Sequence, residues 1–260
     1  MKILVLTTWN NKIKELYAYK FLKTYSWPFD LKIYNEDDGM YEQIPDLLKF
    51  IKKFKHLNIS SSINQDISKD ALRFCFKVFA YTNEIINNHK KYDAIIFIDA
   101  DTEFLNRVDI NWVKKNIYKY DNMLTYLGRS FFTETGFILF NCKHPNLINF
   151  AIELQSFYTE GEIFKEKYFH DCWAFDKIRE KYEKKFKTKN YNIGDSYLKE
   201  NIIIFFHKFF SFLKIIDIFR KNEFLRKAFL LNTVMERSVL SNYLRHNKGN
   251  KEKILKEIES

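Results

Sequence analysis

The sequence predicts an α/β fold in which a mostly parallel central sheet is flanked by helices and followed by a helical C-terminal extension. The chain opens with a strand–helix–strand pattern over residues 2–34, which is typical of a βαβ unit. An apolar run between Tyr92 and Asp101 ends abruptly in carboxylates, as a central parallel strand does where its carboxyl end opens onto a site. Only 6 Gly and 3 Pro occur in 260 residues, which leaves little for flexible linkers or a turn-rich all-β architecture.

The N-terminal unit is defined by its hydrophobic period. Residues 2–7 form a short apolar run that predicts a buried strand, and residues 10–25 carry apolar side chains at helical spacing. Pro28 ends this helix, because the residue before a proline is driven out of the helical region. Residues 31–34 then predict the second strand.

The rest of the chain continues the alternation of helices and strands. Further helices are predicted at 45–54, 70–86, 146–157 and 172–182, and further strands at 123–127 and 136–140. From residue 201 the chain becomes rich in aromatic and basic side chains. We therefore predict one domain over 1–200 and a helical C-terminal extension over 201–260.

The net charge indicates the kind of partner. The chain has 43 basic and 33 acidic side chains, a formal net charge of +10 and a pI of about 9.2. This surplus favours a polyanionic partner, which could be a nucleic acid, a nucleotide diphosphate or an anionic membrane surface. Composition alone leaves all three open.

Cysteine usage, the N-terminal residues and the lack of a long apolar stretch predict the cellular compartment. The three cysteines are an odd number without metal-type spacing, which argues against a disulfide framework or a zinc ribbon. The N-terminus lacks the pattern of a secretory signal, and no apolar stretch reaches the length of a membrane span. We expect a cytoplasmic protein.

Residues 202–220 combine Phe, Leu and Ile with Lys and Arg at helical spacing. Such a segment suits a helix lying on an anionic membrane surface, which would make the protein peripheral on the inner face of the cell membrane. Packing in the core or in a homodimer is the more common explanation of an apolar stripe. Both interpretations remain open.

The strongest chemical signal is the pair Asp99 and Asp101. Two carboxylates one residue apart at the end of a strand can reach one hard divalent cation, and Mg²⁺ and Mn²⁺ commonly complete their shell with phosphate oxygens. A further acid, Glu103, follows. The alternative is a solvated loop, but burying two like charges so close together without a cation is unfavourable.

Four segments carry a resemblance to a known superfamily. Residues 92–102, YDAIIFIDADT, resemble the metal-binding strand of GT-A glycosyltransferases. Residues 135–141, TGFILFN, resemble a strand motif of glycosyltransferase family eight and related bacterial sugar transferases, and residues 170–173, HDCW, stand where those enzymes carry an Asp-Gln pair. Residues 245–249, RHNKG, are similar to their C-terminal His- and Gly-containing element, although the Gln, the His–Gly spacing and a closing Pro-Trp differ.

The resemblance implies a GT-A fold, which is Rossmann-like, with 1–200 as the nucleotide-sugar-binding catalytic domain and 201–260 completing the site. It implies that the DxD carboxylates and a C-terminal histidine hold the cation, that a Lys-Gly pair cradles the diphosphate, and that two further acids act at the donor sugar. The residues matching these roles are, for the metal, Asp99, Asp101 and His246; for the diphosphate, Lys248 and Gly249; and for catalysis, Asp171 and Glu134.

Further donor contacts follow from the same resemblance. Thr7, Thr8 and Trp9 at the end of the first strand and Asp38 after the second would lie beside the nucleobase, and Ala100 and Lys77 near the donor. Each residue also has a structural interpretation: turn chemistry for the strand ends, pairing or snorkelling for Lys77. Asp171 could instead be a helix N-cap, and Lys248 an ordinary surface lysine. His246 could be solvated, in which case His207 is the rival metal ligand.

These residues predict a metal-dependent glycosyltransferase. It would use Mn²⁺ or Mg²⁺ and move a sugar from a nucleotide-sugar, expected to be UDP-linked, to a glycan or lipid-linked acceptor with retention, as in cell-envelope polysaccharide biosynthesis. The alternatives are a Mg²⁺-dependent nucleotidyltransferase and a non-catalytic basic module that binds nucleic acid or membrane. The first normally has a Gly-rich loop that LTTWNNK lacks, and no nucleic-acid signature supports the second.

Overall fold

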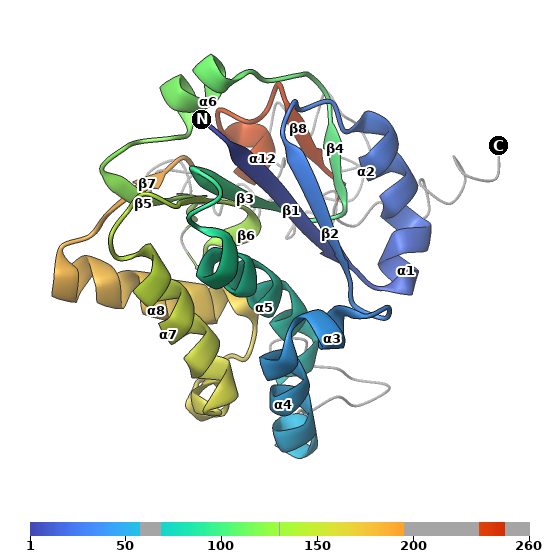
Figure 1. The fold of residues 1–260 in the computed structure, drawn as a ribbon, viewed down its shortest axis with the longest axis vertical. Coiled ribbons are helices and arrows are strands. Elements are labelled where there is room, and N and C mark those ends of the chain that lie inside the picture. The colour runs from blue at the N-terminus through green and yellow to red at the C-terminus, as the bar shows by residue number, and fades with distance from the viewer. Residues whose placement is uncertain (58–68, 130, 195–233, 248–260) are drawn as a thin grey trace, which may run out of the picture.

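The computed structural model describes residues 1–57, 69–129, 131–194 and 234–247. Within these ranges six strands form a central sheet in the order β2-β1-β3-β6-β5-β7 (Figure 1). Their bounds are β1 Ile3–Trp9, β2 Asp30–Asn35, β3 Ala94–Ile98, β5 Asn122–Leu127, β6 Glu134–Asn141 and β7 Lys189–Asn192. The predicted α/β class is therefore confirmed.

The sheet is mostly parallel, as predicted. Strand β1 pairs in parallel with both β2 and β3, and β5 pairs in parallel with β7. Strand β6 runs antiparallel to its neighbours β3 and β5. Because β1, β2 and β3 share one direction, their carboxyl ends meet at one edge of the sheet, where an open α/β sheet binds its ligand.

Helices cover both faces of this sheet (Figure 1). One face packs against α3 (Met40–Gln43), α4 (Pro45–Phe54), α5 (Ala71–Asn88), α7 (Leu147–Thr159) and α8 (Asp171–Phe186). The other face packs against α2 (Tyr19–Thr24), α6 (Ile110–Asn116) and α12 (Val234–Arg237). Side chains of β1 alternate between the two layers, since Leu4 and Leu6 join the first core and Ile3 and Val5 the second.

The predicted elements are found near their expected bounds. Helix α4 begins and ends as predicted, and β5, β6, α7 and α8 extend a few residues beyond the predicted ranges. The predicted helix over 10–25 is continuous but changes character, from α1 (Asn11–Ile13) through a π-helical turn (Lys14–Ala18) to α2. Strand β7 and helix α6 were not predicted, because both are short.

A second, two-stranded sheet was not expected from the sequence. Strand β4 (Thr102–Phe104) pairs antiparallel with β8 (Leu244–His246), with Thr102 opposite His246. The backbone N–H of Asn247 also donates to the carbonyl of Asp101 at 2.9 Å. This pairing brings the end of the described chain to the turn that follows β3.

Most of the predicted extension, 201–260, lies outside the described residues, and with it the amphipathic segment 202–220, His207, Lys248 and Gly249. Its described part is residues 234–247. The structure buries Leu240 and Leu244 in the second core, together with α12. Among the described residues, no helix has both the length and the apolar character to cross a lipid bilayer.

Candidate functional site

The predicted carboxylate pair lies where the chain leaves the sheet. Strand β3 is buried along its whole length and ends at Ile98. The next residues turn sharply, because the N–H of Thr102 donates to the carbonyl of Asp99 at 3.1 Å, and the N–H of Asp99 donates to the carbonyl of Gly136 at 3.0 Å. Ala100 is buried in the core between the two acids. The residue between the carboxylates therefore anchors the turn.

His246 joins this pair from β8. Its Nε2 lies 2.9 Å from Oδ1 of Asp101, and the residue is 4% exposed. Its Nδ1 is buried without a hydrogen-bond partner in the described part of the chain. One ligand atom from each of Asp99, Asp101 and His246 lies within 4.8 Å of the others, a spacing that one metal ion can span. The solvated alternative for His246 is therefore wrong.

Gly136 of β6 forms one wall of this cluster. A Cβ atom at this position would lie 3.1 Å from Oδ2 of Asp99, 3.3 Å from Cε1 of His246 and 3.4 Å from Oε1 of Glu134. Contacts this short would force the neighbouring groups apart. The glycine therefore keeps space in front of the carboxylates, and its surroundings place Glu134 at the same cluster.

Lys77 of α5 links the cluster to Asp171. Its Nζ lies 2.9 Å from Oδ1 of Asp99 and 2.9 Å from Oδ2 of Asp171, and 5.1 Å from the centre of the Phe97 ring. Burial opposes the charge of this lysine, but the two carboxylates outweigh it and raise the pKa of Lys77 well above its usual value. The ammonium group is therefore charged and holds both acids.

Asp171 is the first residue of α8 and is 2% exposed. The N-cap interpretation for it is wrong, because the cap is His170, whose Nδ1 accepts a hydrogen bond from the N–H of Trp173 at 3.1 Å. Burial favours the neutral carboxyl, but the charge of Lys77 and a 2.5 Å hydrogen bond from the Thr135 hydroxyl lower the pKa of Asp171. Asp171 is therefore a buried carboxylate that stays ionised.

Two residues that support the predicted acids were missed by sequence reasoning. Nη1 of Arg129 lies 3.1 Å from Oε2 of Glu134, and its Nε donates to the carbonyl of Phe132 at 2.7 Å. Thr135 holds Asp171, as described above. Arg129 lies outside the quoted motifs, and Thr135 lies within the 135–141 motif but was given no role of its own, since only the folded chain brings both residues to the acids.

The cluster concentrates negative charge. Burial and the neighbouring Asp101 raise the pKa of Asp99 even though Lys77 opposes the shift. Burial alone would lower the pKa of His246, but hydrogen bonding and the charge of Asp101, with Glu134 and Asp99, raise it. The neighbouring carboxylates contribute to both upward shifts, and a bound cation would offset their negative charge.

The other predicted donor contacts are placed as follows. Thr7 is buried, and its Oγ1 has no hydrogen-bond partner in the described residues. Trp9 is 5% exposed and packs edge-on against Phe21 in the second core. Asp38 is exposed and accepts a 2.6 Å hydrogen bond from Asn35. The structure therefore places Trp9 in the core and Asp38 on the surface next to β2.

Glu36 directly follows β2, and sequence reasoning passed over it in favour of Asp38. Its carboxyl interacts with the Thr8 hydroxyl and feels the charges of Asp99 and Lys77. Burial raises the pKa of Glu36 to about 7, against the hydrogen bond from Thr8. An unusual pKa beside the acidic cluster marks this residue as part of the same region.

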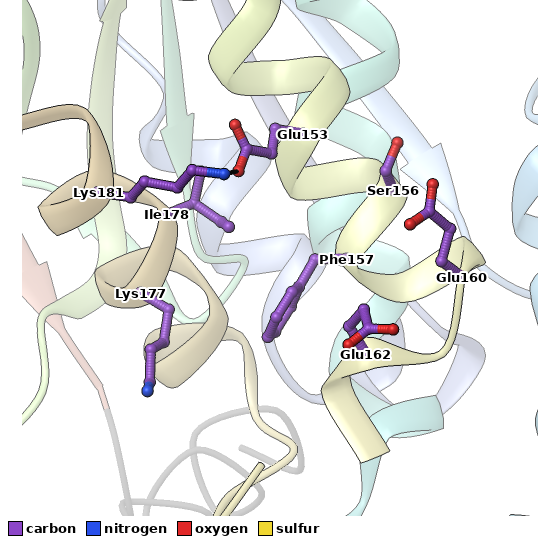
Figure 2. A pocket seen from close by; sticks show the side chains of 8 residues that line it. All are labelled: Glu153, Ser156, Phe157, Glu160, Glu162, Lys177, Ile178 and Lys181. Carbon is purple, nitrogen blue, oxygen red and sulfur yellow. Dashed lines mark hydrogen bonds and ion pairs between the residues drawn. The ribbon is translucent and has the colours of Figure 1, made fainter. Parts of the chain in front are cut away.

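A pocket of about 330 Å³ lies between α7 and α8 (Figure 2). It is lined by Glu153, Ser156, Phe157, Glu160, Glu162, Lys177, Ile178 and Lys181. Figure 2 shows Lys181 pointing at Glu153, with which it forms an ion pair. None of the predicted site residues lines this pocket, so the acidic cluster is a separate place in the molecule.

No protein-family model matches the sequence, and no curated protein matches it. Two structures of the glycosyltransferase GlyE of Streptococcus pneumoniae TIGR4 are similar to this chain at 15% and 14% identity, with TM-scores of 0.49 and 0.43. The alignments cover 96% and 73% of this chain but only 56% and 45% of GlyE. A glycosyltransferase involved in glycosylation of the major capsid of PBCV-1 aligns over 99% of this chain and 100% of its own, at 11% identity and a TM-score of 0.45.

Proposed function

We propose that this protein is a metal-dependent glycosyltransferase that takes its sugar from a nucleotide-sugar. The observation that carries the proposal is the group of Asp99, Asp101 and His246 at the carboxyl end of β3, with Lys77 beside it. Two carboxylates and one imidazole suit a divalent cation, and the imidazole favours Mn²⁺ over the harder Mg²⁺. The space kept by Gly136 is consistent with an ion in front of these groups.

A divalent cation bound here would take up oxygens of a diphosphate and neutralise the charge that develops as the nucleotide leaves. The chain's own contribution is a second positive charge. Lys77 is held 2.9 Å from Asp99, so its ammonium group lies beside the cation ligands and can also bind a phosphate oxygen. We place Lys248 and Gly249 at the same diphosphate, as the resemblance implies.

Asp171 and Glu134 are proposed to act at the sugar. Sugar transfer passes through a centre with positive charge at the anomeric carbon, which an ionised carboxylate stabilises. Asp171 is kept ionised by Lys77 and Thr135, and Glu134 is held by Arg129. Retention of configuration remains a proposal that rests on the resemblance.

The finer assignments belong to the same proposal. The nucleotide would be UDP, with Thr7, Thr8, Asp38 and Ala100 near the nucleoside or diphosphate, and the acceptor would be a glycan or a lipid-linked saccharide. The basic surplus suits an anionic acceptor or a membrane surface. We propose a cytoplasmic enzyme of envelope polysaccharide synthesis that contacts the membrane, or a second copy, through 202–220.

The test is calorimetric titration of UDP into the full chain with Mn²⁺, with Mg²⁺ and with EDTA. We expect UDP to bind with Mn²⁺ and to lose most of its affinity in EDTA. Asp101→Ala should abolish the dependence on metal, whereas Asp121→Ala, which removes an exposed carboxylate outside the cluster, should bind UDP as the parent does. The proposed function is excluded if UDP binds with the same affinity with and without metal, and equally well in the parent and in Asp101→Ala.

A further inference from the structure

A group of four aromatic side chains lies at the N-terminal end of α8. Phe132 is at its centre, with ring centroids 5.3 Å from Tyr168, 4.7 Å from His170 and 5.8 Å from Trp173. The ring of Phe132 meets all three edge to face, at interplanar angles of 72°, 71° and 77°. We call these four residues the aromatic cluster. All four are only partly buried.

The aromatic cluster is joined to the proposed catalytic acids. His170 directly precedes Asp171 and caps the same helix. Arg129 binds Glu134 through one nitrogen and the carbonyl of Phe132 through another. Phe132 and Glu134 therefore share Arg129 as a positioning residue, and His170 and Asp171 are neighbours at the start of α8.

The segment that carries Phe132 is also fixed from the other side. The N–H and the hydroxyl of Thr133 donate to the two carboxylate oxygens of Asp176 at 2.8 and 2.5 Å, and Asp176 in turn pairs with Arg179 at 3.0 Å. Such bonds hold the ring in place before any ligand arrives. A preformed aromatic surface loses little conformational entropy on binding.

Polar groups surround the rings. Nε1 of Trp173 donates to Oε2 of Glu166 at 2.8 Å, and Lys177 lies 3.3 Å from the same carboxylate and 5.0 Å from the centre of the Trp173 ring. A ligand seated here would meet aromatic faces in the middle and a carboxylate and an ammonium group at the edge. A purely structural core would not require charged groups beside the aromatic rings.

A pyranose ring has the matching chemistry. Its axial C–H bonds carry partial positive charge and pack on the electron-rich face of an aromatic ring, while its hydroxyl groups bond to carboxylates and ammonium groups at the rim. A nucleobase could also stack on these rings, but it has fewer hydroxyl groups to bond to the polar rim. The proposed function already places the nucleobase at the ends of β1 and β2. A sugar fits the observations better.

We propose that the aromatic cluster is the acceptor subsite and binds a pyranose ring of the acceptor glycan next to Asp171 and Glu134. The term acceptor rests on the proposed function, since a sugar bound here is an acceptor only if the cluster around Asp99 holds a donor. Recognition of the pyranose itself depends only on the four rings and their polar rim.

The experiment is saturation-transfer NMR on the full chain with a panel of methyl pyranosides of glucose, galactose, mannose, xylose, N-acetylglucosamine and N-acetylgalactosamine. Neither metal nor nucleotide is added. We expect saturation to reach the ring C–H protons of at least one pyranoside, and the signal to fall about fivefold in Phe132→Leu, which keeps apolar volume but removes the aromatic face. Phe186→Leu, at the far end of α8, removes a 45% exposed ring and should leave the signal unchanged.

Tyr168→Leu is a second variant, which gives the same readout if Phe132→Leu does not fold. Absence of signal from every pyranoside, or equal signals in the parent and both folded variants, overturns the subsite. If the protein binds UDP with Mn²⁺ but binds no pyranoside, this inference is wrong and the proposed function stands. If the protein binds a pyranoside through Phe132 but does not bind UDP, the sugar site is supported and its role as an acceptor site is wrong.

Discussion

Helix α5 carries two charged side chains two helical turns apart, buried Glu84 and partly buried Lys77, and their surroundings differ. Glu84, near the end of the helix, is 1% exposed and is paired with Lys32, with the Tyr34 hydroxyl at 2.5 Å and with the Asn88 amide at 2.8 Å. Lys77, in its first half, faces Asp99 and Asp171. One carboxylate has several donors at the Glu84 end, whereas one ammonium group serves two carboxylates at the Lys77 end.

We infer that Glu84 stabilises the fold, whereas the charges around Lys77 are arranged to bind a ligand. A buried carboxylate surrounded by donors is satisfied, and removing it leaves those donors unpaired. At the Lys77 end, two carboxylates share one ammonium group, and burial together with the charge of Asp101 raises the pKa of Asp99. The two ends of α5 should therefore respond to substitution in opposite ways.

Asp99→Ala should have the largest effect, and on cation binding rather than on folding. Loss of a direct ligand should weaken Mn²⁺ about 1000-fold, beyond the 10- to 100-fold typical of groups that only support a ligand. The free energy of unfolding should change little, because like-charge repulsion with Asp101 disappears together with the Lys77 contact. Titration calorimetry and urea unfolding measure the two quantities, and an unfolded variant or an unchanged Mn²⁺ affinity would contradict the comparison.

Glu84→Ala should give the reverse result. It leaves the Tyr34 hydroxyl and Lys32 without their buried acceptor and should lower the free energy of unfolding by about 3 kcal/mol. Mn²⁺ affinity should stay within about twofold of the parent, since the site is two helical turns away. A stable variant with weakened Mn²⁺ binding would show that the two ends of α5 are not independent.

Glu36→Gln should stabilise the protein at high pH. The carboxyl has a pKa of about 7 in the folded chain and 4.5 as its ordinary value, so its neutral form favours folding. That stability is fully present below pH 4.5 and is lost as the pH rises through 7. Glutamine keeps the neutral form, and we expect a gain of about 2 kcal/mol at pH 8, after a reduction for partial exposure, and almost none at pH 4.

Urea unfolding of the parent and Glu36→Gln at pH 4 and pH 8 measures this prediction. Glu42→Gln, which makes the same change at an exposed position, is the matched control and should show no such difference between the two pH values. An equal effect of Glu36→Gln at both pH values would mean that the carboxyl is not buried in the neutral form.

Gly136→Ala should have the smallest effect and should act on the cation alone. The new methyl group would press on Asp99 at 3.1 Å and on His246 at 3.3 Å, so both ligands must shift by a few tenths of an ångström. We expect Mn²⁺ affinity to fall about tenfold, which corresponds to about 1.4 kcal/mol, and thermal unfolding to change little. Unchanged Mn²⁺ affinity would mean that the cation does not use the space in front of Gly136.

The sequence predicted those parts of the fold and site that depend on local pattern. The position of Asp99 and Asp101 could be predicted because a wholly apolar strand ends there in charged residues. Helix α4 could be predicted because its apolar spacing starts at a proline, which is favourable at the first helical position.

What could not be predicted depends on contacts between distant residues. The pairing of Thr102 with His246 joins two short strands whose sequences carry no strand period of their own. Arg129 and Thr135 have roles only because they face Glu134 and Asp171 in the folded chain. Trp9 packs with Phe21 in the second core, a contact that the sequence of β1 alone does not show.

The short sheet of β4 and β8 has a consequence for the order of synthesis. All six strands of the central sheet precede residue 194, and His246 comes only later in the chain. A nascent chain can therefore assemble the sheet and bring Asp99, Lys77 and Asp171 together before the ribosome has released the histidine. The proposed cation site would be complete only when β8 docks on β4, so a premature stop before residue 244 would yield a folded sheet that lacks one of the three proposed cation ligands.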